Sequence, residues 1–224
     1  MIQVSTFEAA AHRTIKVEAA GRRWEMHSPS DIESLWESMT NEEFVEDERL
    51  PYWVELWPAS IVLADWINSR KDMLAGRLCL DLGCGIGLTA MAASSVGARV
   101  LAVDYEEQAL DFARHNAVVN RVAQPLWAVM DWRFPAVRKH SFDFIWGGDI
   151  MYERRFVCPV LDFLEFSLAP GGKVWLAEPS RNVYDDFRAA LPSRGWSLQL
   201  VCRGMAEPLQ EQKSKVSVSL WELA

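Results

Sequence analysis

The chain has 224 residues, of which 50% are hydrophobic, and carries a formal net charge of −8 from 31 acidic and 23 basic residues. This length and composition favour one globular α/β domain, and no apolar run reaches the ~20 residues that cross a bilayer, so no membrane partner is expected. The acidic balance disfavours binding to a phosphate backbone, so we expect no nucleic-acid partner. Four cysteines without metal-ligand spacing, scattered histidines and a start without a signal-peptide pattern predict a cytoplasmic protein with reduced thiols and no metal site.

Residues 1–49 are predicted to form an N-terminal extension that consists of a hairpin and a helix. Two short runs, 14–18 and 22–27, predict the hairpin. Ser30-Asp31-Ile32-Glu33 has the spacing of a capping box and predicts a helix through Met39. The acidic residues that gather between 31 and 48 form either a solvated face or a surface that attracts a lysine-bearing partner.

Residues 50–224 are predicted to form one domain in which strand and helix patterns alternate. Five apolar runs separated by helical stretches predict a mostly parallel, Rossmann-like sheet with helices on both faces. Two apolar runs near the end of the chain predict a C-terminal antiparallel hairpin, which gives an α/β fold with seven strands. The predicted strands are 77–81, 99–104, 126–130, 142–147, 172–178, 197–202 and 216–221, and the principal predicted helices are 58–68, 88–96 and 107–116.

The run Asp81-Leu-Gly-Cys-Gly-Ile-Gly87 joins the first of these strands to a predicted helix. Glycines at 83, 85 and 87 allow sharp turns at positive φ and let a ligand lie against the main chain. A dinucleotide-binding loop would require a glycine at position 88, where the chain has Leu88. The loop therefore indicates a nucleotide-like ligand other than a dinucleotide, or else a strand–helix turn alone.

Acidic residues end the next two predicted strands. Asp104 lies 21 residues after Gly83, at the place where an acid can accept hydrogen bonds from both hydroxyls of a ribose. The same residue precedes the helix 107–116, so it could instead cap that helix. Asp131 follows the third strand and is followed by Trp132.

The segment Gly147-Gly148-Asp149-Ile150-Met151-Tyr152 follows the fourth strand and is expected beside the same ligand. An anionic Asp149 could bind and orient an amine, and Tyr152 could supply a hydroxyl and an aromatic wall for a cation. The alternative is that Asp149 caps the next helix and Tyr152 is an aromatic residue of the core.

The pattern Asp81-x-Gly83-x-Gly85-x-Gly87 resembles the first motif of the class I, seven-β-strand S-adenosylmethionine-dependent methyltransferases. The resemblance implies that S-adenosyl-L-methionine is the cofactor and that Asp81 and the three glycines hold its methionyl end. It also implies that Asp104 binds the ribose and that Asp131 and Trp132 contact the adenine.

Asp149-x-x-Tyr152 resembles the corresponding motif of protein-lysine methyltransferase family 16. With the runs 51–58 and 217–221, it is similar to the subgroup that modifies the electron-transfer-flavoprotein β subunit. The resemblance implies that Asp149 and Tyr152 hold an acceptor lysine of that subunit or of another protein. It also implies that Trp57 lies against the cofactor, unless Trp57 belongs to the core.

One departure from the subgroup concerns the segment after the fifth strand, where Gly-Asp-Pro-Gly-Arg is replaced by Ala177-Glu178-Pro179-Ser180-Arg181. An altered pocket rim could mean another substrate. A small-molecule or ribosome-associated methyltransferase, and a cofactor-binding module without catalysis, therefore remain alternatives to a protein-lysine methyltransferase.

Overall fold

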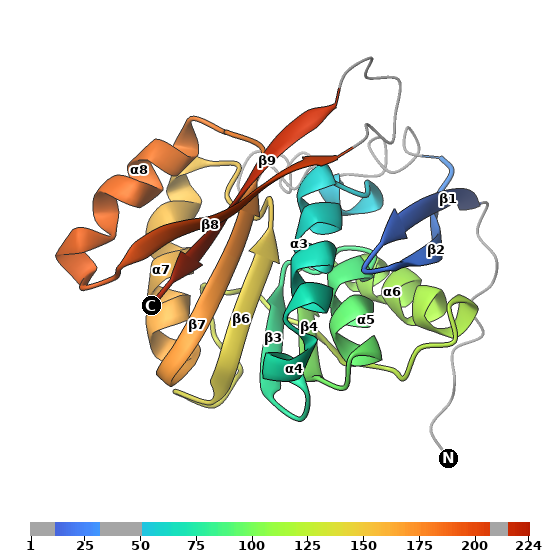
Figure 1. Cartoon of the computed structure of the whole chain (residues 1–224), viewed down its shortest axis with the longest axis horizontal. Helices are drawn as coiled ribbons and strands as arrows, with labels where there is room; N and C mark the ends of the chain where they lie inside the picture. Colours follow the sequence, from blue (N-terminus) through green and yellow to red (C-terminus); the bar gives the residue numbers. More distant parts are fainter. Residues whose placement is uncertain (1–11, 32–50, 207–214) are drawn as a thin grey trace.

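The structure is a computed structural model, and it describes residues 12–31, 51–206 and 215–224 (Figure 1). The described residues form a seven-stranded sheet covered by helices, with a two-stranded sheet beside it. The helix predicted over 30–39 and most of the acidic run lie outside the described residues.

The large sheet has the strand order β5-β4-β3-β6-β7-β9-β8. The first five strands in this order run parallel, whereas β9 is antiparallel to both of its neighbours, β7 and β8. The strands are β3 (Leu78–Leu82), β4 (Arg99–Asp104), β5 (Leu126–Val129), β6 (Phe142–Gly148), β7 (Leu168–Glu178), β8 (Leu198–Ala206) and β9 (Val216–Leu223). The predicted fold class and the C-terminal antiparallel pair are therefore confirmed.

Helices cover both faces of the sheet because alternate side chains of each buried strand point to opposite faces. Along β7, for example, Trp175 and Ala177 join one core, whereas Val174 and Leu176 join the other. The first core contains side chains of α3 (Pro58–Ser69), α5 (Leu88–Ser95) and α6 (Glu107–Val119), and the second contains those of α7 (Val157–Ser167) and α8 (Val183–Ala190). Shorter elements are α4 (Lys71–Leu74), η1 (Tyr52–Val54), η2 (Arg154–Phe156) and η3 (Pro192–Arg194).

Two boundaries differ from the predicted ones by four residues, since β7 begins at Leu168 rather than at residue 172 and β8 ends at Ala206 rather than at residue 202. Leu168 pairs with Phe142 of β6, and the register then shifts before Phe144 pairs with Lys173. This irregularity accommodates Pro170 and the two glycines after it, because a proline is tolerated in a strand where the ladder is interrupted.

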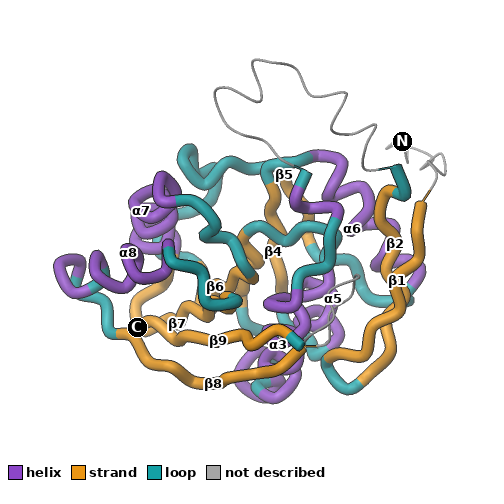
Figure 2. The backbone as a smooth tube through the Cα atoms, turned by 90° about the horizontal axis from the view of Figure 1, so that it is seen from above, coloured by secondary structure: helices purple, strands orange, loops and turns teal. Residues whose placement is uncertain are grey.

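The N-terminal hairpin forms as predicted, from β1 (His12–Ala19) and β2 (Arg22–Pro29), and lies against α6 (Figure 2). Asn116 of α6 joins it to the glycine loop, because its amide donates to the carbonyls of His27 and Ile86, at 3.0 Å in each case. Tertiary structure also brings together three histidines that are scattered in the sequence, since His12 stacks on His27 and His27 contacts His115.

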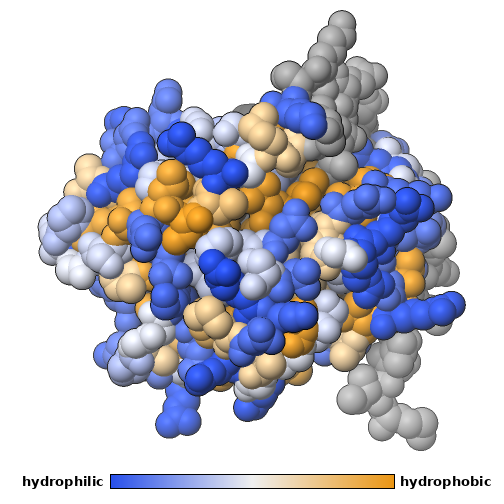
Figure 3. Space-filling model, viewed as in Figure 1, coloured by the Kyte–Doolittle hydropathy of each residue, from blue (hydrophilic) through white to orange (hydrophobic). Residues whose placement is uncertain are grey.

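The face of the molecule that carries β8 and β9 has a band of hydrophobic side chains among hydrophilic ones (Figure 3). Met205 of β8 is the exposed hydrophobic residue of that strand.

Candidate functional site

A pocket of about 160 Å³ opens at the carboxyl ends of β3, β4, β5 and β6. Because β4 and β6 lie on opposite sides of β3, the chain order reverses there, which is where open α/β sheets bind ligands. Nine of the ten predicted site residues line this pocket. They are Trp57, Gly83, Gly85, Gly87, Asp104, Asp131, Trp132, Asp149 and Tyr152.

The glycine loop needs glycine for its backbone as well as for the pocket. Gly83, Gly85 and Gly87 all have positive φ, at 67°, 50° and 93°. At Gly87 a Cβ would lie only 2.9 Å from the Cβ of Ala113, so the close approach of α6 also excludes a side chain. The two interpretations of the motif, a tight turn and a ligand-binding loop, are therefore compatible.

Asp81 is the predicted site residue that does not line the pocket. Its side chain is buried beneath the loop and accepts a hydrogen bond of 2.5 Å from the Thr89 hydroxyl in the first turn of α5. Burial raises the pKa of this carboxyl to about 7, although the Thr89 hydroxyl lowers it. The structure thus places Asp81 where it links β3 to α5.

Asp104 lies at the end of β4 and is buried. One carboxylate oxygen accepts the Gly85 amide at 2.8 Å and the other accepts the Glu106 amide at 3.1 Å. Burial raises the pKa of Asp104, and the hydrogen bonds from backbone amides oppose that rise. The helix-cap alternative is not what forms, because α6 begins after Glu106 and its N-cap has no side-chain hydrogen bond.

Asp131 and Trp132 lie beyond the end of β5 and line the pocket beside Asp104. Asp131 is paired with Arg133, whose backbone amide donates to it at 2.8 Å and whose guanidinium lies 2.8 Å from its other oxygen. The indole of Trp132 packs edge-on against Phe156, with ring centroids 5.4 Å apart.

Asp149 forms a bidentate ion pair with Arg181, a residue of the segment that follows β7. The Arg181 Nε lies 2.6 Å from one carboxylate oxygen and a terminal nitrogen lies 2.7 Å from the other. Burial raises the pKa of Asp149, and Arg181 opposes that rise. Asp149 has a left-handed φ of 54° and precedes η2 by several residues, so it caps no helix.

Tyr152 belongs to an aromatic cluster at the mouth of the pocket and is only partly buried. It packs edge-on against Tyr52 and Phe156, with centroids 5.1 Å and 5.2 Å apart. Tyr52 also contacts Trp57, whose indole donates to the Tyr52 carbonyl at 2.9 Å. Burial raises the pKa of Tyr152, so its hydroxyl stays protonated near neutral pH.

Sequence reasoning did not identify Tyr52, Phe156 or Arg181 as residues of the site. Tyr52 and Arg181 lie in motifs that the resemblance did include, but neither motif says which side chains meet. Arg181 also lies over the Trp57 ring, with its Cζ 5.7 Å from the centroid, so it joins the ion pair to the aromatic cluster.

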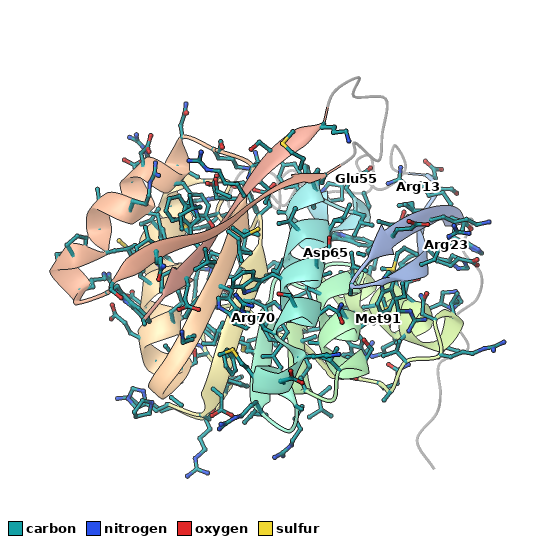
Figure 4. The ribbon with its side chains drawn as sticks, viewed as in Figure 1. Arg13, Arg23, Glu55, Asp65, Arg70 and Met91 are labelled. Carbon is teal, nitrogen blue, oxygen red and sulfur yellow. The ribbon has the colours of Figure 1, made fainter. Side chains whose placement is uncertain are left out.

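The hairpin supports the wall of the pocket formed by residues 52–57. Arg13 of β1 forms a 2.7 Å ion pair with Glu55, a pocket residue, and Figure 4 shows these two side chains close together. Arg13 also donates to the Val54 carbonyl at 3.3 Å. Nearby, the Ala20 amide in the hairpin turn donates to Asp65 of α3 at 2.7 Å, which fixes the other end of the hairpin.

The described part of the chain contains neither a candidate metal cluster nor a candidate membrane-spanning helix. No group of three or more His, Cys, Asp or Glu side chains there has the arrangement of a metal site. Within the same residues, no helix has both the length and the apolar character needed to span a bilayer.

Comparisons with known proteins support the resemblance seen in the sequence. The family model described as ribosomal protein L11 methyltransferase matches residues 61–148. The electron transfer flavoprotein beta subunit lysine methyltransferase of Danio rerio is 32% identical over 138 residues, which cover 61% of this chain and 53% of that protein. The chain thus spans about half the length of this curated relative.

Two solved structures have the same fold. Precorrin-6y C5,15-methyltransferase of Geobacter metallireducens superposes with a TM-score of 0.60 at 14% identity, over 73% of this chain and 88% of that one. Magnesium protoporphyrin IX methyltransferase of Synechocystis with bound SAM superposes with a TM-score of 0.57 at 17% identity, over 87% and 91%. The chain therefore has the class I methyltransferase fold.

Proposed function

We propose that this chain, which has the class I methyltransferase fold, transfers a methyl group from S-adenosyl-L-methionine to a lysine side chain of another protein. One observation carries the proposal. A single pocket joins the glycine loop and the strand-end acids to Asp149 and Tyr152. The similarity to lysine methyltransferases of the flavoprotein β subunit supports the acceptor class.

The residues of the pocket fit the proposed cofactor. At Gly85 a Cβ would meet only the Trp53 carbonyl oxygen, at 3.6 Å, so the loop leaves its backbone open to a ligand. Asp104 uses each carboxylate oxygen for a backbone amide and retains lone pairs that can accept two ribose hydroxyls. Asp131 can accept from an adenine amino group, with Trp132 against the ring.

When bound, the proposed cofactor would supply a methyl group on a sulfonium, and the neutral thioether left behind would be an intrinsically favourable leaving group. The lysine nitrogen lone pair forms the new bond to carbon, the carbon–sulfur bond breaks toward sulfur, and a proton passes from the amine to water. The residues of this chain therefore act mainly by positioning.

Arg181 determines what Asp149 can do for the amine. A lysine has an ordinary pKa of about 10.4 and must be deprotonated before it attacks. A buried, unpaired carboxylate would favour the ammonium form, whereas an Asp149 already paired with Arg181 adds little net charge to the site. The paired carboxylate can still accept an N–H hydrogen bond, which aims the lone pair of the neutral amine.

Tyr152 and its neighbours form the wall beside the proposed amine. Because the Tyr152 hydroxyl stays protonated, it cannot serve as a phenolate base, and its role is to donate a hydrogen bond or to pack. The ring of Tyr52 suits a methylated ammonium, whose positive charge persists as methyl groups accumulate. Trp57, whose ring lies under the Arg181 guanidinium, keeps its proposed place against the cofactor.

The proposal is tested with radiolabelled S-adenosyl-L-methionine, purified flavoprotein β subunit and a host-cell lysate. We expect a labelled protein band with the wild-type chain and at least about 1,000-fold slower labelling with Asp149→Ala, while cofactor affinity stays within a few-fold. Asp162→Ala is the matched control, since Asp162 is an exposed acid whose partner is Arg194.

Other outcomes would change the proposal in defined ways. Label in RNA or small molecules but not in protein would contradict the proposed substrate class. Cofactor binding without transfer to any component would favour a binding module. A collapse of cofactor affinity in Asp149→Ala would assign Asp149 to the cofactor site.

A second candidate acceptor is ribosomal protein L11, which the matching family model favours. That match covers residues 61–148 and ends before Asp149, so it includes the predicted cofactor residues of β3 to β5 and not the acceptor motif. Purified L11 belongs in the same assay, where faster labelling of L11 than of the flavoprotein subunit would favour this candidate.

A further inference from the structure

A second, polar pocket of about 190 Å³ is lined by Arg181, whose ion-pair partner Asp149 lines the first pocket. It lies at the end of β7 and is bounded by the segment after that strand, by α8 and by the paired strands β9 and β8. The guanidinium of Arg181 holds Asp149, which lines the first pocket, so the two pockets adjoin across this ion pair.

Three side chains on neighbouring strands of the sheet line one side of this second pocket. Glu178 of β7 pairs with Ser219 of β9, and Ser219 pairs with Arg203 of β8. Paired residues of neighbouring strands point to the same face, so these three side chains form a row.

The acids of the second pocket already have partners. Glu178 accepts the Trp221 indole N–H at 3.1 Å through one oxygen and the Arg181 amide at 3.1 Å through the other. Asp185 forms an ion pair with Arg188 on the same face of α8. The carboxylates of Glu178 and Asp185 are therefore already bound by donors of the protein itself.

Two donors in the same pocket have no such partner. The Tyr184 hydroxyl is buried, and within the described residues it makes no hydrogen bond. Burial also raises the pKa of Tyr184, which keeps this hydroxyl a donor. Arg203 is an exposed residue, and its guanidinium forms no ion pair with another described residue. A buried hydroxyl without a hydrogen-bond partner costs folding free energy, and a ligand that accepts a hydrogen bond from it removes that cost.

From these contacts we infer that the second pocket binds a carboxylate of the acceptor protein, next to the lysine that is methylated. The planar guanidinium of Arg203 matches a carboxylate, and the Tyr184 hydroxyl supplies a further donor. The inference rests on the proposed function for the identity of the ligand, because a group held beside Arg181 adjoins the proposed amine site. The carboxylate belongs either to an acidic side chain or to the end of the acceptor chain.

The test measures carboxylate binding directly and requires no methyl transfer. Isotope-labelled protein is titrated with N-acetylglutamate α-amide, which carries a side-chain carboxylate, and with N-acetylglutamine, which carries an α-carboxylate. N-acetylglutamine amide is the neutral control. The readout is the NMR signal of the Trp221 indole N–H, which adjoins the pocket.

We expect saturable shifts with a millimolar Kd for at least one carboxylate and at least 10-fold weaker binding of the neutral control. Arg203→Gln and Tyr184→Phe should each weaken carboxylate binding by about 5-fold or more and leave cofactor affinity unchanged. Arg99→Gln, at an exposed position at the start of β4, is the matched control and should bind as the wild type does.

Equal shifts with charged and neutral probes, or unchanged carboxylate binding in Arg203→Gln, would overturn the inference. So would tighter binding of inorganic phosphate than of either carboxylate. The two proposals fail separately. Protein methylation without carboxylate binding would contradict only the second pocket. Carboxylate binding without any methyl transfer would contradict the proposed function, and with it the source of the carboxylate, but would leave the carboxylate site itself standing.

Discussion

We name the two sides of the main pocket after their proposed ligands. The cofactor half is the side formed by the glycine loop, Asp104 and Asp131, and the acceptor half is the side formed by Asp149, with its partner Arg181 behind it, and the aromatic cluster. In the cofactor half the acids are held by groups nearer in the sequence, 2 to 19 residues away, namely the Glu106 and Gly85 amides for Asp104 and Arg133 for Asp131. In the acceptor half the partners are distant, since Arg181 lies 32 residues from Asp149.

This difference indicates how each half acquires its specificity. The cofactor half depends on strand ends and on backbone amides, which the fold supplies in every chain of this architecture. The acceptor half depends on side chains from residues 52–57, from the segment after β6 and from the segment after β7. A change in any one of these segments changes the acceptor site without changing the cofactor site.

The most severe test of this separation is Asp104→Ala. The substitution removes the proposed ribose acceptor and leaves the Gly85 and Glu106 amides without their partner, so we expect the Kd for S-adenosyl-L-methionine to rise about 100-fold. Calorimetric titration measures it, with Asp111→Ala on the exposed side of α6 as the control. A Kd within 3-fold of the wild type would remove Asp104 from the cofactor half.

The second test concerns Asp81, which belongs to the cofactor half by its motif but lies behind the pocket. Because burial raises its pKa above the unfolded value, its contribution to stability is fully present below the unfolded pKa and is lost as pH rises toward its folded pKa of about 7. Without cofactor, the free energy of unfolding of Asp81→Asn relative to the wild type should rise by about 2 kcal/mol between pH 5 and pH 7.

Denaturant titrations at the two pH values measure this difference. Asp72→Asn, an exposed acid of α4, provides the control and should show no such change. A pH-independent difference for Asp81→Asn would mean that Asp81 is not the group whose titration opposes folding.

The third test addresses the acceptor half through Arg181. Removing its guanidinium in Arg181→Met takes away the interactions that lower the pKa of Asp149, so the acid limb of the pH–rate profile should move to higher pH. We expect about 10-fold slower turnover with cofactor affinity unchanged, and partial recovery in Arg181→Lys, which restores the charge but not the bidentate geometry.

The comparison between the halves would fail if Arg181→Met weakened cofactor binding as much as Asp104→Ala does. A slower turnover with an unmoved pH profile would leave Arg181 with a structural role only. The two halves are independent if each variant affects only its own ligand.

The sequence alone was sufficient for the fold class, for the seven strands as they follow one another along the chain, and for most of the residues that line the cofactor half. The reason is that each of these features depends on a pattern of residues that are neighbours in the sequence. Short apolar runs separated by helical stretches predict strands, glycine spacing predicts the loop, and acids at the ends of parallel strands meet at one edge of the sheet. Asp81 is the exception, because its motif position does not say whether the side chain faces the pocket or the base of α5.

The sequence also predicted Asp149 and Tyr152, but tertiary structure alone decided which side chains they contact, and it alone formed the second pocket. No local pattern indicates that Arg181 pairs with Asp149, that Tyr52 packs on Tyr152, or that Arg203 lies in register with Glu178. These contacts depend on how β7, the pair β8 and β9, and residues 52–57 are placed relative to the rest of the sheet. Such placement is a property of packing over the whole domain, so it follows from the folded chain and not from the spacing of residues along it.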